Sequence, residues 1–304
     1  MPTPAVHIGP DENPVLREAV ERGGGKVVPL AEAEALVVAG GHGDLPELHD
    51  GIRWVQLPSA GVEAWVASGA VDTARTWTSA AGAYSTSVAE GAVALLLAGV
   101  RGIGRAARAT TWDNDALDGV QTSLRGATVG IVGAGGIGSA MIPALTGLGA
   151  RVLAVTRRGL PVEGAAETWA ADRVREVFAA ADHVVLAAPA TAETAALVGA
   201  AELRALGPQG WLVNIARGTL VDTDALVEAL RDGTIAGAAL DVTDPEPLPD
   251  GHPLWTEPRA IVTPHSTNPS TLRLPLQAER VTENVRRFAA GEELLGLVDP
   301  ERGY

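Results

Sequence analysis

One segment of this 304-residue chain limits its possible folds more than any other: residues 128–138, which read TVGIVGAGGIG. An apolar run ends at Val132, and Gly133, Gly135 and Gly138 follow it with the spacing G-x-G-x-x-G at the start of a helix-like stretch. The first glycine permits a tight turn, the second lets the backbone approach a pyrophosphate, and the third lets helix and strand pack closely. A helix N-terminus also offers unpaired N–H groups to phosphate. The segment therefore predicts a dinucleotide site, with the cofactor-binding residues Gly133, Gly135, Gly136, Ile137 and Gly138.

The composition excludes several classes of function. Aspartate and glutamate number 37 and lysine and arginine 23, so the formal net charge is −14. Such an acidic chain repels nucleic-acid phosphates and anionic membrane surfaces, and we expect neither as a partner. The chain has no cysteine, which removes disulfides, thiolate nucleophiles and cysteine-bound metals. It has no apolar run of the roughly 18 residues that a membrane span needs, and no signal-peptide pattern at its start, so we expect a cytoplasmic protein.

Short apolar runs alternate with helix-length segments, which indicates parallel sheets covered by helices. Strands are predicted early in the chain at residues 27–30, 35–39 and 54–57. A second series is predicted at residues 129–132, 151–155, 183–187, 211–215, 236–240 and 260–263. A long helix is expected over residues 85–105, and a last helix over about residues 271–290 is expected to return to the first domain.

This order predicts an α/β fold with two doubly wound parallel-sheet domains. Residues 1–95 and 270–304 are expected to form a flavodoxin-like substrate domain. A Rossmann dinucleotide-binding domain, residues 96–269, is inserted into it.

The second strand of the later series ends in Thr156, Arg157 and Arg158. NAD-binding versions of this fold usually carry Asp or Glu there to hold the ribose 2′-hydroxyl. A carboxylate would repel a 2′-phosphate, whereas two guanidinium groups and a hydroxyl would bind it. Alternatively, both arginines are solvated surface residues. The segment favours NADP(H) as the cofactor and leaves NAD(H) as the alternative.

Three later segments place reactive side chains just after predicted strands. In the later series of strands, Arg217 follows the fourth strand, in the motif NIARG. Asp241 and Glu246 follow the fifth strand, in DVTDPEPLP, and His265 follows the sixth, in TPH. Parallel sheets place their ligands at the carboxyl ends of the strands. Residues far apart in sequence are therefore expected to lie close together at that edge.

The ordered series of motifs resembles the D-isomer-specific 2-hydroxyacid dehydrogenases, the family of the glyoxylate/hydroxypyruvate reductases. The series runs SAGV at residues 59–62, SVAE at residues 87–90, then GIVGAGGIG, NIARG, ALDVTDPEPLP, HPLW and TPH. It covers nearly the whole chain and is more specific than any single motif. The resemblance implies interconversion of a small 2-oxo acid and a D-2-hydroxy acid, and a homodimer built on the cofactor domains.

The resemblance also implies residue roles. Arg217 corresponds to the arginine that holds the substrate carboxylate, His265 to the acid that protonates the carbonyl oxygen, and Glu246 to the partner of that histidine. These roles suit the chemistry, because hydride addition to a ketone creates an alkoxide that needs a nearby proton donor. A neighbouring carboxylate stabilises the imidazolium form of a histidine.

Further residues correspond to the family's binding positions. Ser59, Ala60 and Gly61 resemble the loop that binds the substrate carboxylate, where small residues expose backbone N–H groups; the alternative is an ordinary strand-ending turn. Three more residues are expected to contact the cofactor: Pro189, Ala216 and Asp241. Pro189 could instead end a strand, and Asp241 could cap a loop.

Other interpretations stay open. No histidine has a second ligand at metal-binding spacing, so we expect no metal site. Some relatives act as dinucleotide-sensing corepressors, but Arg217, Glu246 and His265 together favour an enzyme over a catalytically weak regulator. A glutamine would stand in place of Glu246 in the formate dehydrogenases. Nothing in the sequence selects one 2-oxo acid over another.

Overall fold

The computed structural model describes residues 3–300. The chain divides into two compact units, one running to Tyr84 and resuming at Pro269, the other comprising Ser85–Asn268. The domain boundary expected near residue 95 lies inside helix α3 (Ser85–Val100), which packs against α6 (Gly136–Gly147) of the second unit. No helix within residues 3–300 is long and apolar enough to cross a membrane.

The first unit is built on a parallel sheet with the strand order β2-β1-β3-β4-β5. In chain order this is 2-1-3-4-5, the flavodoxin-like order, as the sequence predicts. The strands are β1 (Ala5–Gly9), β2 (Lys26–Val27), β3 (Ala35–Val38), β4 (Trp54–Gln56) and β5 (Thr76–Thr78). The helices are α1 (Pro14–Arg22), α2 (Glu63–Ala67) and α10 (Ser270–Ala290).

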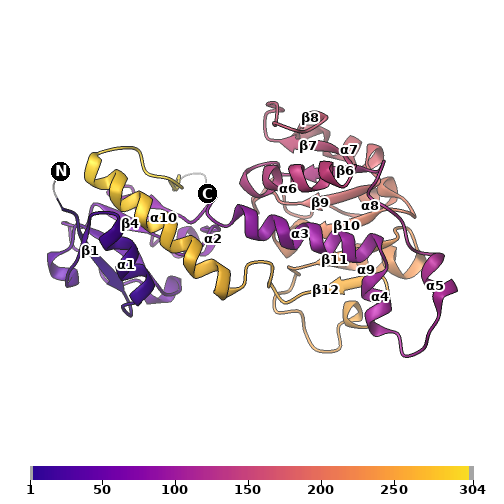
Figure 1. Ribbon diagram of the computed structural model, residues 1–304, viewed down its shortest axis with the longest axis horizontal. Helices are drawn as coiled ribbons and strands as arrows, with labels where there is room; N and C mark the ends of the chain where they lie inside the picture. The colour runs from indigo at the N-terminus through magenta and orange to yellow at the C-terminus, as the bar shows by residue number, and fades with distance from the viewer. Residues whose placement is uncertain (1–2, 301–304) are drawn as a thin grey trace. The chain divides into compact units, whose positions relative to one another are not determined.

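Side chains of β3 alternate between two cores because successive residues of a strand face opposite sides of the sheet. Ala35 and Val37 pack in the core that α1 and α10 cover, and Leu36 and Val38 pack in the core on the other face. Figure 1 shows α10 lying along α1. The last helix therefore returns to the first unit, as predicted.

The second unit has a parallel sheet with the order β12-β11-β10-β9-β6-β7-β8. Numbered within the unit this is 3-2-1-4-5-6 with a seventh strand added, which is the Rossmann order. Its strands are β6 (Thr128–Val132), β7 (Arg151–Thr156), β8 (Glu167–Ala170), β9 (His183–Leu186), β10 (Trp211–Asn214), β11 (Gly237–Leu240) and β12 (Ala260–Val262). Strand β8 is not predicted from the sequence.

Helices cover both faces of this second sheet. Helices α3 and α6 pack together, with α3 against β10 and β11. A continuous apolar core joins the sheet to α7, α8 and α9 on the other face. The remaining helices are α4 (Ile103–Arg108), α5 (Asn114–Asp118), α7 (Val174–Ala180), α8 (Ala200–Leu206) and α9 (Thr223–Asp232). The helix expected over residues 85–105 is broken at Gly102, whose φ of 63° is left-handed.

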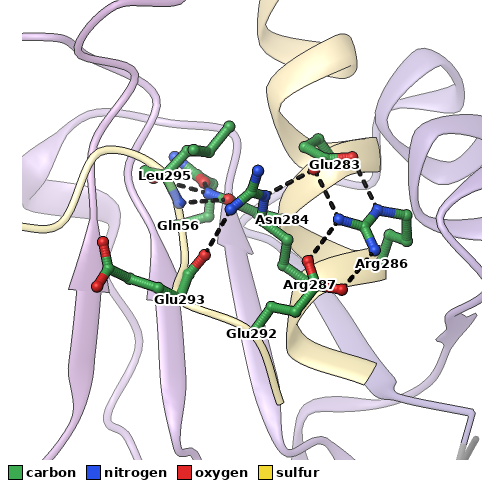
Figure 2. Close-up of polar contacts among 8 residues, drawn as sticks. All are labelled: Gln56, Glu283, Asn284, Arg286, Arg287, Glu292, Glu293 and Leu295. Atoms are coloured by element: carbon green, nitrogen blue, oxygen red, sulfur yellow. Dashed lines mark hydrogen bonds and ion pairs between the residues drawn. The ribbon is translucent and has the colours of Figure 1, made fainter. Parts of the chain in front are cut away.

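A buried amide network fixes α10 to the sheet of the first unit (Figure 2). The Asn284 side chain donates to Gln56 Oε1 at 2.8 Å and to the Leu295 carbonyl at 3.0 Å, and its Oδ1 accepts from the Leu295 N–H at 2.8 Å. Asn284 and Gln56 are both fully buried. A buried polar group costs stability unless it is paired, so each partner in this network depends on the others.

Nearby, Glu283 accepts hydrogen bonds from Arg286 and Arg287, which lower the pKa of its carboxyl to about 2 (Figure 2). These groups are partly exposed to solvent, which screens ion pairs and limits their contribution to stability. The buried amide is therefore the stronger anchor.

Replacing Asn284 with alanine is expected to destabilise the first unit by about 2 kcal/mol, because both polar groups of Leu295 lose their partner. Urea unfolding followed by circular dichroism measures the change. Glu279→Ala, on an exposed part of the same helix, is the control and should leave the midpoint unchanged. Equal midpoints for the two variants would show that the network does not anchor α10.

Candidate active site

The glycine turn between β6 and α6 is shaped as a dinucleotide turn requires. Gly133 has a φ of 96°, and a Cβ there would lie 2.4 Å from the Ala188 nitrogen. A Cβ on Gly138 would lie 2.5 Å from the Gly133 oxygen, so the third glycine allows the close approach of helix and strand. A Cβ on Gly135 would meet no atom within 4 Å and would project into open space. The middle glycine thus keeps clear the space that a pyrophosphate would need.

The turn is tied to the end of the neighbouring strand β7. The N–H groups of Gly133 and Ala134 both donate to the Val155 carbonyl, at 3.1 and 2.8 Å. Directly beyond lies a cavity of about 460 Å³. Its lining residues are Ala134, Ser139, Thr156, Arg157, Arg158, Leu160, Pro161, Val162 and Glu163. The structure therefore places the three predicted residues at the end of β7 in one cavity with part of the glycine turn.

Glu163 also lines this cavity, which the sequence does not predict. It belongs to the loop between β7 and β8, and the strand that ends this loop was itself not predicted. Its carboxylate shares the cavity with Arg157 and Arg158. An acidic group there would oppose the binding of a ribose 2′-phosphate, whereas the two guanidinium groups would favour it.

The adjacent strands β9 and β10 lead into Pro189 and Ala216. Pro189 accepts a hydrogen bond from Thr194 Oγ1 at 2.7 Å, and the Ala216 N–H donates to Asn214 Oδ1 at 3.0 Å. Because β10, β9, β6 and β7 are neighbours in the sheet, both residues follow strands at the edge that carries the glycine turn. Their predicted contact with a cofactor stays a prediction.

Arg217 is held in the turn after β10 by a buried asparagine. The Asn214 side chain donates to the Arg217 carbonyl at 2.9 Å, while Arg217 Nη1 donates to the Ala216 carbonyl at 2.7 Å. A Cβ on Gly218 would lie 1.9 Å from the Thr243 carbonyl group. The glycine of NIARG is therefore needed for close packing of the Arg217 turn on the segment that carries Glu246.

His265 and Glu246 form a direct pair, with His265 Nδ1 2.8 Å from Glu246 Oε1. Their side chains are 53% and 42% exposed, so both remain accessible to a small molecule. With Nδ1 engaged by the carboxylate, Nε2 is the ring nitrogen left for another partner. The pairing expected from the sequence is present in the structure.

Asp241 lies at the end of β11 and is only 2% exposed. Its carboxylate accepts hydrogen bonds from the segment around His265, and its own N–H donates to the Asn214 carbonyl at 2.9 Å. It thus connects the strand before Arg217 with the loop of His265.

The predicted carboxylate loop lies in the first unit, directly after β4. Ser59 Oγ donates to the Gly61 carbonyl at 2.6 Å, and the Ala80 N–H donates to the Ser59 carbonyl at 2.8 Å. Tyr84, whose pKa burial raises to about 12, donates its hydroxyl to the Pro58 carbonyl at 2.6 Å. Ser59, Ala60 and Gly61 thus form a defined turn. They belong to a different unit from Arg217, Glu246 and His265.

Within residues 3–300, no group of three or more histidine, aspartate or glutamate side chains is arranged to hold a metal ion. The reactive groups of the candidate site include the guanidinium of Arg217 and the His265–Glu246 pair. Such a set can bind an anion and exchange a proton.

Comparison with known proteins identifies one family. Residues 93–267 match the model of the D-isomer specific 2-hydroxyacid dehydrogenase NAD-binding domain. The chain is 40% identical, over 94% of its length and 95% of the other, to an uncharacterised protein of Corynebacterium melassecola. It is also 40% identical to the glyoxylate reductase of Thermococcus gammatolerans, over 58% of this chain and 52% of that protein. The match thus spans about half the length of that reductase.

A solved structure is similar over the whole chain. It is a D-isomer specific 2-hydroxyacid dehydrogenase from Xanthobacter autotrophicus Py2 in complex with NADPH and MES. The two chains share 29% identity with a TM-score of 0.84, and the similarity covers 100% of each.

Proposed function

Because this chain belongs to the D-isomer specific 2-hydroxyacid dehydrogenase family, we propose that it reduces a small 2-oxo acid to the D-2-hydroxy acid with a nicotinamide dinucleotide. The observation that carries the proposal is the His265–Glu246 pair, 2.8 Å apart and exposed. The pair and Arg217 follow strands of the sheet whose carboxyl edge also carries the glycine turn. That edge is where such sheets bind ligands.

The residues present divide the work of the reaction. The Arg217 guanidinium binds the substrate carboxylate through parallel N–H···O hydrogen bonds. A nicotinamide dinucleotide held at Gly133, Gly135 and Gly138 would supply the hydride that the carbonyl carbon accepts. His265 gives the proton on Nε2 to the carbonyl oxygen as negative charge develops there, and Glu246 stabilises the imidazolium through Nδ1. Ser59, Ala60 and Gly61 are proposed to offer backbone N–H groups to the substrate carboxylate.

The glycine turn fits a dinucleotide, because the space in front of Gly135 is open while Gly133 and Gly138 are tightly enclosed. We favour NADP(H) over NAD(H), since Thr156, Arg157 and Arg158 line the adjoining cavity. The NADPH complex of the Xanthobacter relative is consistent with this choice.

Glu163 is expected to limit the preference for NADPH. Replacing it with glutamine removes a negative charge from the cavity and should tighten NADPH binding by about two- to fivefold, the modest effect of a solvent-screened charge. NADH binding, which involves no 2′-phosphate, should change less. Titration of tryptophan fluorescence with each cofactor measures both constants. Weaker NADPH binding in Glu163→Gln would mean that the carboxylate itself contacts the cofactor.

The configuration of the product tests the proposed reaction. Pyruvate or hydroxypyruvate incubated with enzyme and reduced cofactor should yield only the D-hydroxy acid by chiral chromatography. The L acid, or a racemate, would contradict the assignment. No product from any 2-oxo acid, with cofactor binding intact, would favour the alternative of a dinucleotide-sensing regulator.

A cytoplasmic location stays a prediction that cell fractionation would test.

We also propose a homodimer formed by the second units. Trp112 is 98% exposed, and the acidic arm, residues 112–118, adds Asp113, Asp115 and Asp118. The same unit has a cavity of about 550 Å³ with Trp211 and Ile261 in its lining. The charged residues that line this cavity are four arginines, Arg105, Arg108, Arg231 and Arg259, and one carboxylate, Glu257. The arm of one copy is complementary in charge to the cavity of another.

Exchanging charges tests this interface. Asp113→Lys with Asp115→Lys should shift the protein toward monomer, because the arm then repels the arginines. Combining these changes with Arg105→Glu and Arg231→Glu should restore the dimer. Light scattering after size-exclusion chromatography gives the mass of each variant. A monomeric wild-type protein, or a charge-swapped variant that stays monomeric, would contradict the interface.

A further inference from the structure

The Asp241 carboxylate is fully occupied by its own chain. Oδ1 accepts from Thr263 Oγ1 at 2.7 Å and from the Ser266 N–H at 2.8 Å, and Oδ2 accepts from the Thr267 N–H at 3.2 Å and Oγ1 at 2.7 Å. A carboxylate offers about four acceptor positions. All are used, in a side chain that is buried.

Every one of these donors flanks His265. Thr263 precedes the histidine, and Ser266 and Thr267 follow it, so the carboxylate holds the segment on both sides. The main chain of Asp241 adds a further contact, because its carbonyl accepts from the His265 N–H at 2.8 Å. The residue therefore holds the whole turn that presents the imidazole.

His265 itself has a left-handed backbone, with a φ of 49°. A non-glycine residue keeps such a conformation only where its surroundings impose it. The hydrogen bonds to Asp241 supply that constraint. Asp241 is in turn fixed to the strand before Arg217 through its N–H bond to the Asn214 carbonyl.

We propose that Asp241 is a positioning residue whose carboxylate sets the orientation of His265. The inference deepens the proposed function, on which its kinetic consequence rests. The charge matters less than the four acceptor positions. An amide of the same size offers half of them, and its NH2 group faces donors that it cannot satisfy.

Asp241→Asn is the direct test. A backbone N–H can only donate. Whichever way the asparagine amide is turned, its NH2 group therefore faces at least one N–H of the turn, and that N–H loses its acceptor. We expect kcat to fall about 10- to 100-fold, as when a group that orients a functional side chain is lost. Asp222→Asn, which alters the N-cap of α9, is the matched control and should keep wild-type kcat.

The position of His265 can be observed without turnover. In protein labelled with ¹³C-histidine, the resonance that disappears in His265→Ala identifies this imidazole. It should shift in Asp241→Asn and stay in place in Asp222→Asn. If wild-type enzyme reduces no 2-oxo acid, the proposed function fails, but this resonance still decides the positioning role.

Thr267→Val keeps the side-chain size and removes one donor, so it covers the case in which Asp241→Asn does not fold. It should lower kcat a few-fold and shift the same resonance, with NADPH binding unchanged. An unmoved His265 resonance in the variants that fold would overturn the inference.

Discussion

Replacing His265 with alanine should lower kcat by about 100- to 10,000-fold, the contribution that a positioned general acid makes. The variant still has Arg217 and the glycine turn, so NADPH binding and the KM for the 2-oxo acid should change little. A loss confined to kcat is the signature of a group that acts in the transition state. Steady-state oxidation of NADPH, together with a fluorescence titration of cofactor binding, separates the two effects.

Two further variants sharpen this expectation. Glu246→Gln should retain the imidazole and lose only its stabilisation, so its kcat should lie between those of wild type and His265→Ala. His42→Ala, in an exposed segment of the first unit, is the matched control and should keep full activity. If His265→Ala keeps near-normal turnover, another group donates the proton.

Replacing Arg157 and Arg158 together with alanine should weaken NADPH binding by about 100-fold, since two charge-assisted hydrogen bonds to a phosphate are lost. NADH has no 2′-phosphate, so its Kd should change by only a few-fold. The ratio of kcat/KM for the two cofactors should therefore move toward NADH. Raising the salt concentration should reduce the wild-type preference, because these arginines lie in solvent.

Arg151→Ala is the control for this pair. Arg151 begins the same strand, β7, at the opposite end from Arg157 and forms an ion pair with Glu167. It should leave both cofactor constants unchanged. Equal losses of NADPH and NADH affinity in the double variant would rule out recognition of a 2′-phosphate by these arginines.

The parallel-sheet architecture could be predicted because the central strands of the second sheet are continuous apolar runs. Residues 129–132 and 183–187 read as buried strands, and both are central in the second sheet. Three strands were missed: β1, β5 and β8. Strand β5 has three residues and β8 is only partly buried, and both lie at sheet edges, where the apolar signal is weak. In β1, His7 interrupts the apolar pattern.

Features that depend on tertiary contacts could not be predicted. The run at residues 27–30 reads as a strand, yet β2 ends at Val27 and a 3-10 turn starts at Leu30. The sequence placed Glu246 and His265 on consecutive loops, which was enough to predict their proximity. It could not show that Asp241 holds four donors around His265, because those bonds depend on how the two loops meet. Glu163 was missed for a similar reason, since its place depends on β8.

The most direct test of the proposed activity is the rate of nicotinamide oxidation with a panel of 2-oxo acids, each measured with NADPH and NADH side by side. We expect turnover of at least one small 2-oxo acid, a higher kcat/KM with NADPH, and loss of that turnover in His265→Ala. The contradicting result would be a protein that binds the dinucleotide but turns over no 2-oxo acid with either cofactor.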